Sequence, residues 1–328
     1  MNYVFILGCH KSGTSLLRHL LDGSKGTVTF PFESHFLAAL GHSINYPMRA
    51  QKGWVTNMNK FIEYVTLLVE SYNEGNSKSS DINLNRKFDL KIFTEEINRV
   101  SDNYTLAELF HVYLTAVTKS LNYELIKESK TIIEKSVEHA EHAVTLKKIF
   151  PAAKFIHIIR NPYSNIVSLR KFKSADGKYP SLAEICLSLK NSYTALTFNS
   201  RYFDNDDYHV IRYEDLIENT KNEMTRIANF LNMEYSRNMI NPTSFGAEWL
   251  GNSTTNLSKS GIYKVDQRPT NLESKLVKIM FEESLEQYYE FDRHTQIRLS
   301  KTIRMMKGES LKTYIRNRTF QLFADLNF

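Results

Sequence analysis

Short apolar runs rich in β-branched and aromatic residues recur along the chain, separated by longer segments of mixed polarity. The four runs are Tyr3–Leu7, Thr131–Ile133, Lys154–Ile159 and Tyr208–Arg212. Helix-like segments follow the first, third and fourth runs, which is typical of strand–helix units in a parallel sheet. Because these strands are apolar along their whole length, both faces of the sheet must be covered. The pattern predicts an α/β fold of three layers, with a central, mainly parallel sheet and helices on both faces.

A long segment without strand-like runs separates the first two of these strands. It contains helix-like stretches at about Asn57–Glu74 and Tyr104–Leu121, and the polar stretch Asn73–Lys87 lies between them. Because the strands on either side must share one sheet, we interpret residues 41–130 as a helical insertion with a surface loop. Residues 1–328 are therefore predicted to form a single domain.

The C-terminal third of the chain is less regular. Helices are predicted at about Lys221–Leu231 and Leu272–Tyr289, and the intervening segment Asn241–Pro269 is rich in Asn, Ser, Thr and Gly. Long irregular segments within a domain are usually functional or disordered. Residues 292–328 are basic with little periodic pattern, and we expect them to form a helical tail.

Composition narrows the class of protein. The chain has 328 residues, is 42% hydrophobic, and carries a formal net charge of +6 from 42 basic and 36 acidic side chains. This is the balance of a globular protein. The two cysteines, Cys9 and Cys186, are too few for a disulfide framework or a four-cysteine zinc site, and indicate a reducing compartment.

The sequence also bears on location and partners. Apolar runs stay far below the roughly 20 residues of a membrane helix, and no signal-peptide pattern is visible. We expect a cytoplasmic protein without a membrane span, although a trimmed luminal protein would look the same. The basic residues are scattered instead of gathered in blocks, which favours a small anionic ligand over nucleic acid.

The loop after the first strand has the composition of a phosphate-binding loop. Gly8 and Gly13 have the spacing of the pattern G-x-x-x-x-G-K-[ST], and Ser15 holds its last position. In such a strand–turn–helix, backbone N–H groups converge on one point and the helix dipole adds positive potential. Thr14, however, occupies the place of the lysine that contacts terminal phosphates, and the lysine stands at Lys11. The pattern predicts a P-loop-like phosphate site and disfavours an ordinary kinase or triphosphatase, although a simple glycine turn is compatible with these residues.

A second candidate anion site follows the strand Lys154–Ile159. Arg160 is placed at the strand's C-terminal end, where ligands bind in open α/β sheets, and Pro162 suits the first turn of a helix. Ser168 lies about two turns along that helix on the same face, so its hydroxyl can add a donor. The alternative for Arg160 is a surface ion pair.

Together, the Lys-Ser-Gly-Thr-Ser-Leu-Leu loop and the Arg-Asn-Pro segment with its later serine resemble the sulfotransferases that use 3'-phosphoadenosine 5'-phosphosulfate (PAPS) and release 3'-phosphoadenosine 5'-phosphate (PAP). The resemblance covers about residues 1–36 and 131–231. It implies that Arg160 and Ser168 bind the 3'-phosphate. The residues that it implies for the 5'-phosphosulfate are Lys11, Ser12, Gly13, Thr14 and Ser15.

Two further segments share this resemblance. Arg212-Tyr213-Glu214-Asp215-Leu216 resembles the family segment whose tyrosine lies by the adenosine, which places Tyr213 there, although an ordinary buried tyrosine fits nearly as well. Lys259-Ser260-Gly261 is a weaker match that adds Ser260 and Gly261 to the nucleotide site.

The resemblance also implies the catalytic groups. Glu33-Ser34-His35-Phe36 resembles the E-x-H-F segment of heparan-type sulfotransferases, whose glutamate is the proposed base, so Glu33 becomes the candidate base. Glu134-Lys135-Ser136 resembles the segment that carries their catalytic lysine, so Lys135 and Lys11 become the lysines that stabilise charge on oxygen. The cytosolic small-molecule branch places a histidine base two residues after this lysine, but Val137 stands there. The alternatives are a helix N-terminal carboxylate for Glu33 and a solvated lysine for Lys135.

These residues imply a metal-independent transfer of a sulfuryl group to a hydroxyl or amine. His139 and His142 are spaced for one helix face but have no third clustered ligand in the sequence, so we expect no metal. A carbohydrate is the preferred acceptor, ahead of a peptide tyrosine or a small molecule. A small-molecule kinase and a non-catalytic nucleotide-binding module stay open as alternatives.

Overall fold

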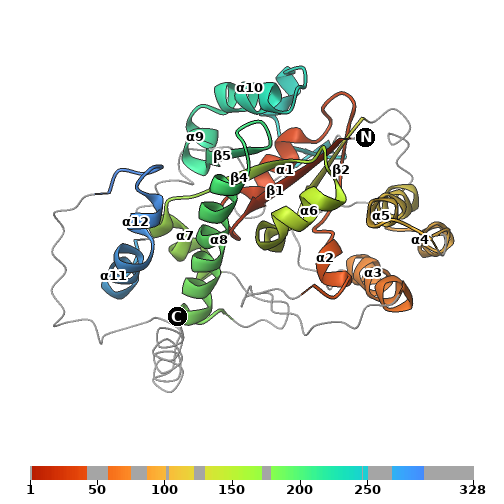
Figure 1. The fold of residues 1–328 in the computed structure, drawn as a ribbon, viewed down its shortest axis with the longest axis horizontal. Coiled ribbons are helices and arrows are strands. Elements are labelled where there is room, and N and C mark those ends of the chain that lie inside the picture. The colour runs from red at the N-terminus through yellow and green to blue at the C-terminus, as the bar shows by residue number, and fades with distance from the viewer. Residues whose placement is uncertain are drawn as a thin grey trace.

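The computed structural model describes residues 2–42, 58–74, 87–100, 103–121, 130–171, 179–245, 247–249 and 268–291. A parallel five-stranded sheet lies at its centre, with helices around it (Figure 1). Its strands, in the spatial order β2-β3-β1-β4-β5, are β1 (Asn2–Gly8), β2 (Thr27–Thr29), β3 (Thr131–Lys135), β4 (Lys154–Ile159) and β5 (Tyr208–Arg212). The predicted α/β sheet is confirmed.

The side chains of β1 divide the core into two layers. Val4 and Ile6 belong to one buried cluster, which also includes side chains of α1 (Thr14–Leu21) and α10 (Thr220–Phe230). Phe5 and Leu7 belong to a second cluster on the other face of the sheet. Successive side chains of a strand point to opposite faces, so the apolar run buries both faces at once. The helices of the second cluster include α5 (Leu106–Ser120), α6 (Ala143–Ile149) and α8 (Leu182–Tyr202).

The described part of the insertion is helical, as predicted. It consists of α3 (Met58–Asn73), α4 (Leu90–Ile97) and α5. Thr105 and Glu108 form a capping box that starts α5, and Phe110 of this helix packs edge-on against Phe36. The insertion therefore joins the core beside the segment that carries Glu33. Helix α4 was not predicted, because it is only two turns long.

Beyond β4, α7 (Pro162–Leu169) and α9 (Tyr213–Glu218) each follow a strand directly. Asn161 caps α7 by accepting a hydrogen bond from the backbone N–H of Tyr163, and Pro162 occupies the first turn. The remaining short elements are α2 (Phe36–Ala39), a 3₁₀ helix at Val137–His142, a second at Arg237–Ile240, and the antiparallel pair β6 (Thr243–Ser244) and β7 (Ala247–Glu248).

The helix predicted at Leu272–Tyr289 is two helices, α11 (Asn271–Met280) and α12 (Glu282–Leu285). Phe281 lies between the two helices and has non-helical backbone angles, φ −131° and ψ −27°. Its buried ring packs against Tyr193. Burial of this aromatic side chain outweighs the continuity of one helix. The tail 292–328 lies outside the described residues, and the single-domain organisation stays a prediction. None of the described helices is both long enough and apolar enough to cross a membrane.

Candidate active site

The loop between β1 and α1 has the backbone of a phosphate cradle. Gly13 adopts φ 104°, and an added Cβ would lie 2.4 Å from the ring of Tyr213. A Cβ on Gly8 would lie 2.5 Å from the carbonyl oxygen of Ile158. Both positions therefore need glycine, because a side chain would collide with neighbouring groups. The helix α1 starts at Thr14, so its first backbone N–H groups face this loop.

Arg160 connects this loop to the neighbouring strand end. Its guanidinium lies over the ring of Tyr213 at 4.6 Å and donates a hydrogen bond to the carbonyl oxygen of Lys11 at 3.0 Å. The structure thus brings together three separately predicted elements: the glycine loop, Arg160 and Tyr213. Ser168 lies in the last turn of α7, partly exposed.

Glu214 holds the turn after Arg160 in place. It accepts a hydrogen bond from the backbone N–H of Asn161 at 3.0 Å and another from the hydroxyl of Tyr289 at 2.9 Å. Its neighbour Asp215 pairs with Arg212. The Arg-Tyr-Glu-Asp segment therefore fixes the second candidate anion site from one side, while Tyr289 reaches it from the C-terminal part of the chain.

Glu33 and Lys135 form a buried ion pair at the same edge of the sheet. The Nζ of Lys135 lies 2.6 Å from Oε1 of Glu33, and the two residues are 2% and 4% exposed. Lys135 ends β3, and Glu33 follows the adjacent parallel strand β2. Because the carboxyl ends of parallel strands meet at one edge, this pairing follows from the topology.

Glu134 fixes the residues that flank this ion pair. It accepts hydrogen bonds from the backbone and hydroxyl of Ser34 at 3.1 and 2.7 Å, and from the hydroxyl of Ser136 at 2.5 Å. Its other oxygen lies 2.8 Å from Nδ1 of His139. Burial acts to raise the pKa of Glu134, but His139 and these hydrogen bonds together lower it. Burial likewise acts to lower the pKa of His139, but Glu134 and the nearby Glu138 and Glu33 raise it.

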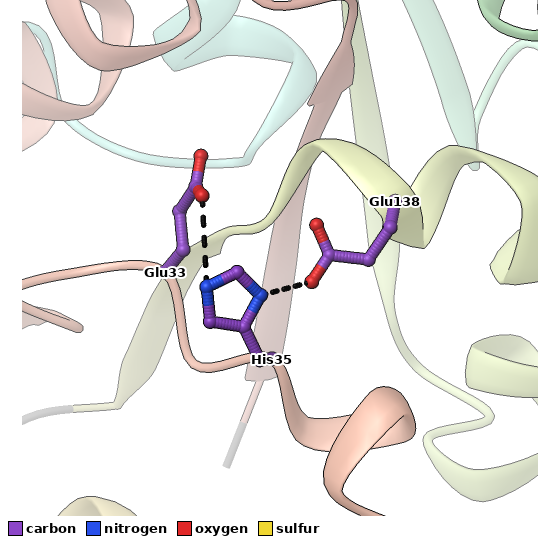
Figure 2. Close-up of side chains that lie close together, drawn as sticks. All are labelled: Glu33, His35 and Glu138. Atoms are coloured by element: carbon purple, nitrogen blue, oxygen red, sulfur yellow. Dashed lines mark hydrogen bonds and ion pairs between the residues drawn. The ribbon is translucent and has the colours of Figure 1, made fainter. Parts of the chain in front are cut away.

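A further histidine lies between two carboxylates in this cluster. His35 places Nδ1 2.5 Å from Oε1 of Glu138 and Nε2 3.8 Å from Oε2 of Glu33 (Figure 2). All three side chains are buried. No role for His35, Glu138 or Glu214 is predicted from the sequence. Their positions could have indicated a role, because His35 lies two residues after the predicted base and Glu138 lies three residues after the predicted lysine.

Ser260 and Gly261 lie outside the described residues, so their predicted part in the nucleotide site stays a prediction. His139 is engaged by Glu134, and the ring of His142 lies 5.5 Å from that of His42. The expectation that no metal binds stays a prediction.

Comparison with known proteins identifies the class. Residues 3–237 match the family described as "Sulfotransferase family". The chain therefore belongs to the sulfotransferase family, as the motifs predicted.

Individual relatives are more distant. A stretch of 122 residues is 28% identical to omega-hydroxy-beta-dihydromenaquinone-9 sulfotransferase Stf3 of Mycobacterium bovis and of Mycobacterium tuberculosis. This match covers 33% of the chain and 30% of the length of each relative. Among solved structures, the sulfotransferase domain from the curacin biosynthetic pathway has a TM-score of 0.53 at 16% identity, over 88% of this chain and 98% of that domain. That likeness supports the fold.

Proposed function

We propose that the protein transfers the sulfuryl group of PAPS to a hydroxyl group of an acceptor. The observation that carries the proposal is the buried Glu33–Lys135 ion pair, which lies at the sheet edge where the phosphate loop begins. A base for the acceptor proton and a cation for the leaving oxygen are the two groups that such a displacement needs. Membership of the sulfotransferase family supports PAPS as the donor.

The nucleotide would be held by two anion sites. Residues 11–15 would bind the 5'-phosphosulfate, because the positive φ of Gly13 and the start of α1 direct backbone N–H groups to one point. Arg160 would bind the 3'-phosphate with Ser168, and its position over Tyr213 orients the guanidinium. Tyr213 would lie along the adenosine, and Ser260 and Gly261 would complete the site.

In the reaction, the acceptor oxygen forms a bond to sulfur as the bond from sulfur to the 5'-phosphate oxygen breaks. Glu33 takes the proton of the acceptor hydroxyl, and Lys135 with Lys11 stabilises the negative charge on the departing oxygen. In the Glu33–Lys135 pair, each side chain offsets the charge of the other at a buried position. Lys135 must leave Glu33 for the leaving oxygen, which frees the carboxylate to act as base.

The acceptor is proposed to be a carbohydrate, on the resemblance of the Glu33–Phe36 segment to heparan-type enzymes. The mycobacterial relative is an omega-hydroxy-beta-dihydromenaquinone-9 sulfotransferase, which gives a second candidate acceptor, the omega-hydroxyl of a menaquinone. Both are alcohols, so Glu33 would play the same part for either.

The direct test uses PAPS carrying ³⁵S in the transferred group. The purified protein is incubated with oligosaccharides, isoprenoid alcohols, tyrosine peptides and phenols, and with water alone as acceptor, without added magnesium. Label transferred to one class of hydroxyl, with release of PAP, supports the proposal. Turnover that needs ATP and magnesium would instead assign a kinase, and binding of PAP without any turnover would assign a non-catalytic nucleotide-binding module.

A further inference from the structure

The ring of His35 is held in one orientation by groups from two parts of the chain. His35 precedes α2 with φ 50°, and its backbone N–H donates to the hydroxyl of Ser136 at 3.2 Å. A left-handed conformation is unfavourable for a non-glycine residue, and it persists where the surroundings determine it. The neighbouring Ser34 is itself fixed by Glu134. The segment after β3 therefore positions the ring next to Glu33.

The contact with Glu138 determines which ring nitrogen carries a proton. A carboxylate only accepts hydrogen bonds, so the 2.5 Å contact requires a proton on Nδ1 of His35. In the neutral ring, the lone pair of Nε2 is then on the side of Glu33 (Figure 2). This is the arrangement by which a buried carboxylate fixes the tautomer of a catalytic histidine.

Charged groups lie on both sides of this ring. Glu33 and Glu138 contact its two nitrogens, Lys135 pairs with Glu33, and Glu134 contacts His139 in the same buried cluster. A proton that arrives at Nε2 of His35 would therefore lie between two carboxylates, which stabilise a positive charge.

Resting on the function proposed above, we propose that His35 and Glu138 form a proton relay behind the base. Glu33 takes the proton of the acceptor hydroxyl and passes it to Nε2 of His35, and Glu138 stabilises the resulting imidazolium. The electron pair of the acceptor O–H bond forms the new O–S bond as the bond from sulfur to the 5'-phosphate oxygen breaks and PAP leaves, and the carboxylate of Glu33 is regenerated. The Nε2–Oε2 distance of 3.8 Å must shorten by about 1 Å for this step, as catalytic hydrogen bonds do when a site closes.

The kinetic test compares Glu138→Gln with Glu138→Asp and with a control, Glu223→Gln. Glu223 is a buried carboxylate of α10 that pairs with Arg226 at 2.8 Å, on the face of the sheet opposite the insertion. We expect Glu138→Gln to lower kcat about 10- to 100-fold with unchanged KM for PAPS. Glu138→Asp should recover part of the lost kcat. Glu223→Gln should have the kcat of the wild type. In a Glu33→Gln background, Glu138→Gln should have no further effect, because the relay acts only through Glu33.

A second readout does not depend on turnover. Two-bond ¹H–¹⁵N correlation spectra of the protein labelled with ¹⁵N-histidine, assigned with His35→Gln, report the protonated nitrogen. We expect the Nδ1–H form for His35, whereas a neutral ring protonated at Nε2 would overturn the relay. Unchanged kcat in Glu138→Gln, or an equal loss in both backgrounds, would also overturn it while leaving the proposed function intact. Activity that a chelator abolishes and a divalent cation restores would make these side chains metal ligands and overturn the relay. Wild-type protein that transfers no sulfuryl group to any acceptor or to water would overturn both proposals.

Discussion

Glu214 accepts a hydrogen bond from the backbone N–H of Asn161, so the residue after Tyr213 fixes the residue after Arg160. The same carboxylate accepts a hydrogen bond from Tyr289, which lies beyond the part of the chain that matches the family. The C-terminal helices are further attached to α7 by Tyr163 with Glu282 and by Arg170 with Glu273. The proposed 3'-phosphate site therefore depends on a segment more than 100 residues away in sequence.

Replacing Tyr289 with Phe should weaken this support. Loss of one hydrogen bond costs about 1 kcal/mol, so we expect a drop of that size in the free energy of unfolding and a PAP affinity about fivefold weaker. Tyr202→Phe is the control, because that side chain is 56% exposed. Denaturant unfolding and calorimetric titration with PAP measure the two effects. Equal results for both variants would contradict a role for Tyr289 in holding the site.

Glu33→Gln tests the proposed base. The amide keeps the size of the side chain but cannot take a proton, so kcat should fall about 10²- to 10⁴-fold. Binding of PAP, measured by calorimetry, should be largely kept, which shows that the site is still folded. A variant that turns over at the wild-type rate would exclude Glu33 as base.

Arg160→Ala tests the assignment of the 3'-phosphate. Loss of the guanidinium should weaken PAP binding about 10- to 100-fold, because a charge-assisted contact with phosphate is lost. Adenosine 5'-monophosphate, which lacks the 3'-phosphate, should bind nearly as to wild type. Competition binding with both nucleotides distinguishes the cases, and equal losses for both would show that Arg160 does not recognise the 3'-phosphate.

Gly13→Ala tests the shape of the phosphate loop. Gly13 and Gly26 both adopt positive φ, but only at Gly13 would a Cβ meet the ring of Tyr213; at Gly26 no atom lies within 4 Å. We expect Gly26→Ala to cost about 1 kcal/mol of stability through backbone strain and to keep PAP binding. Gly13→Ala should cost about 1–3 kcal/mol more through overpacking and abolish PAP binding. Nucleotide binding of both variants in a thermal-shift assay measures the difference, and retained binding by Gly13→Ala would contradict the cradle.

The buried His157 should make the free energy of unfolding sensitive to acid. Burial lowers its pKa from 6.5 to about 3, and its Nδ1 lies within hydrogen-bonding distance of the hydroxyl of Tyr208, at 2.6 Å. Between these two pH values the unfolded chain binds a proton that the folded chain excludes, so stability falls as the pH falls. The expected slope from this residue is about 1.4 kcal/mol per pH unit below pH 6.5. The amide of His157→Gln can still form a hydrogen bond with Tyr208, and the unfolding free energy of this variant should lose this slope. If the unfolding free energies of wild type and variant changed with pH in parallel, His157 would not be the source of the acid sensitivity.

Elements with a long apolar pattern could be predicted from the sequence, and short or packing-dependent elements could not. The strands could be predicted because runs such as Lys154–Ile159 are apolar on both faces, and only a covered parallel sheet buries such a run. Helix α4 has only two turns, too few for its periodicity to define it. The interruption at Phe281 was missed because it depends on a packing partner, Tyr193, that is distant in sequence.

The sequence by itself determined the family and the local elements of the site. The glycine loop and the Arg-Asn-Pro turn are each formed by consecutive residues, so their chemistry can be recognised from a short stretch of sequence. Only the tertiary structure decided how these elements meet. The 2.6 Å pair of Glu33 with Lys135, and the contact of His35 with Glu138, join residues about 100 positions apart. They exist because β2 and β3 pair in parallel and end at the same edge of the sheet. Strand order is set by packing over the whole core, so it cannot be predicted from a short motif.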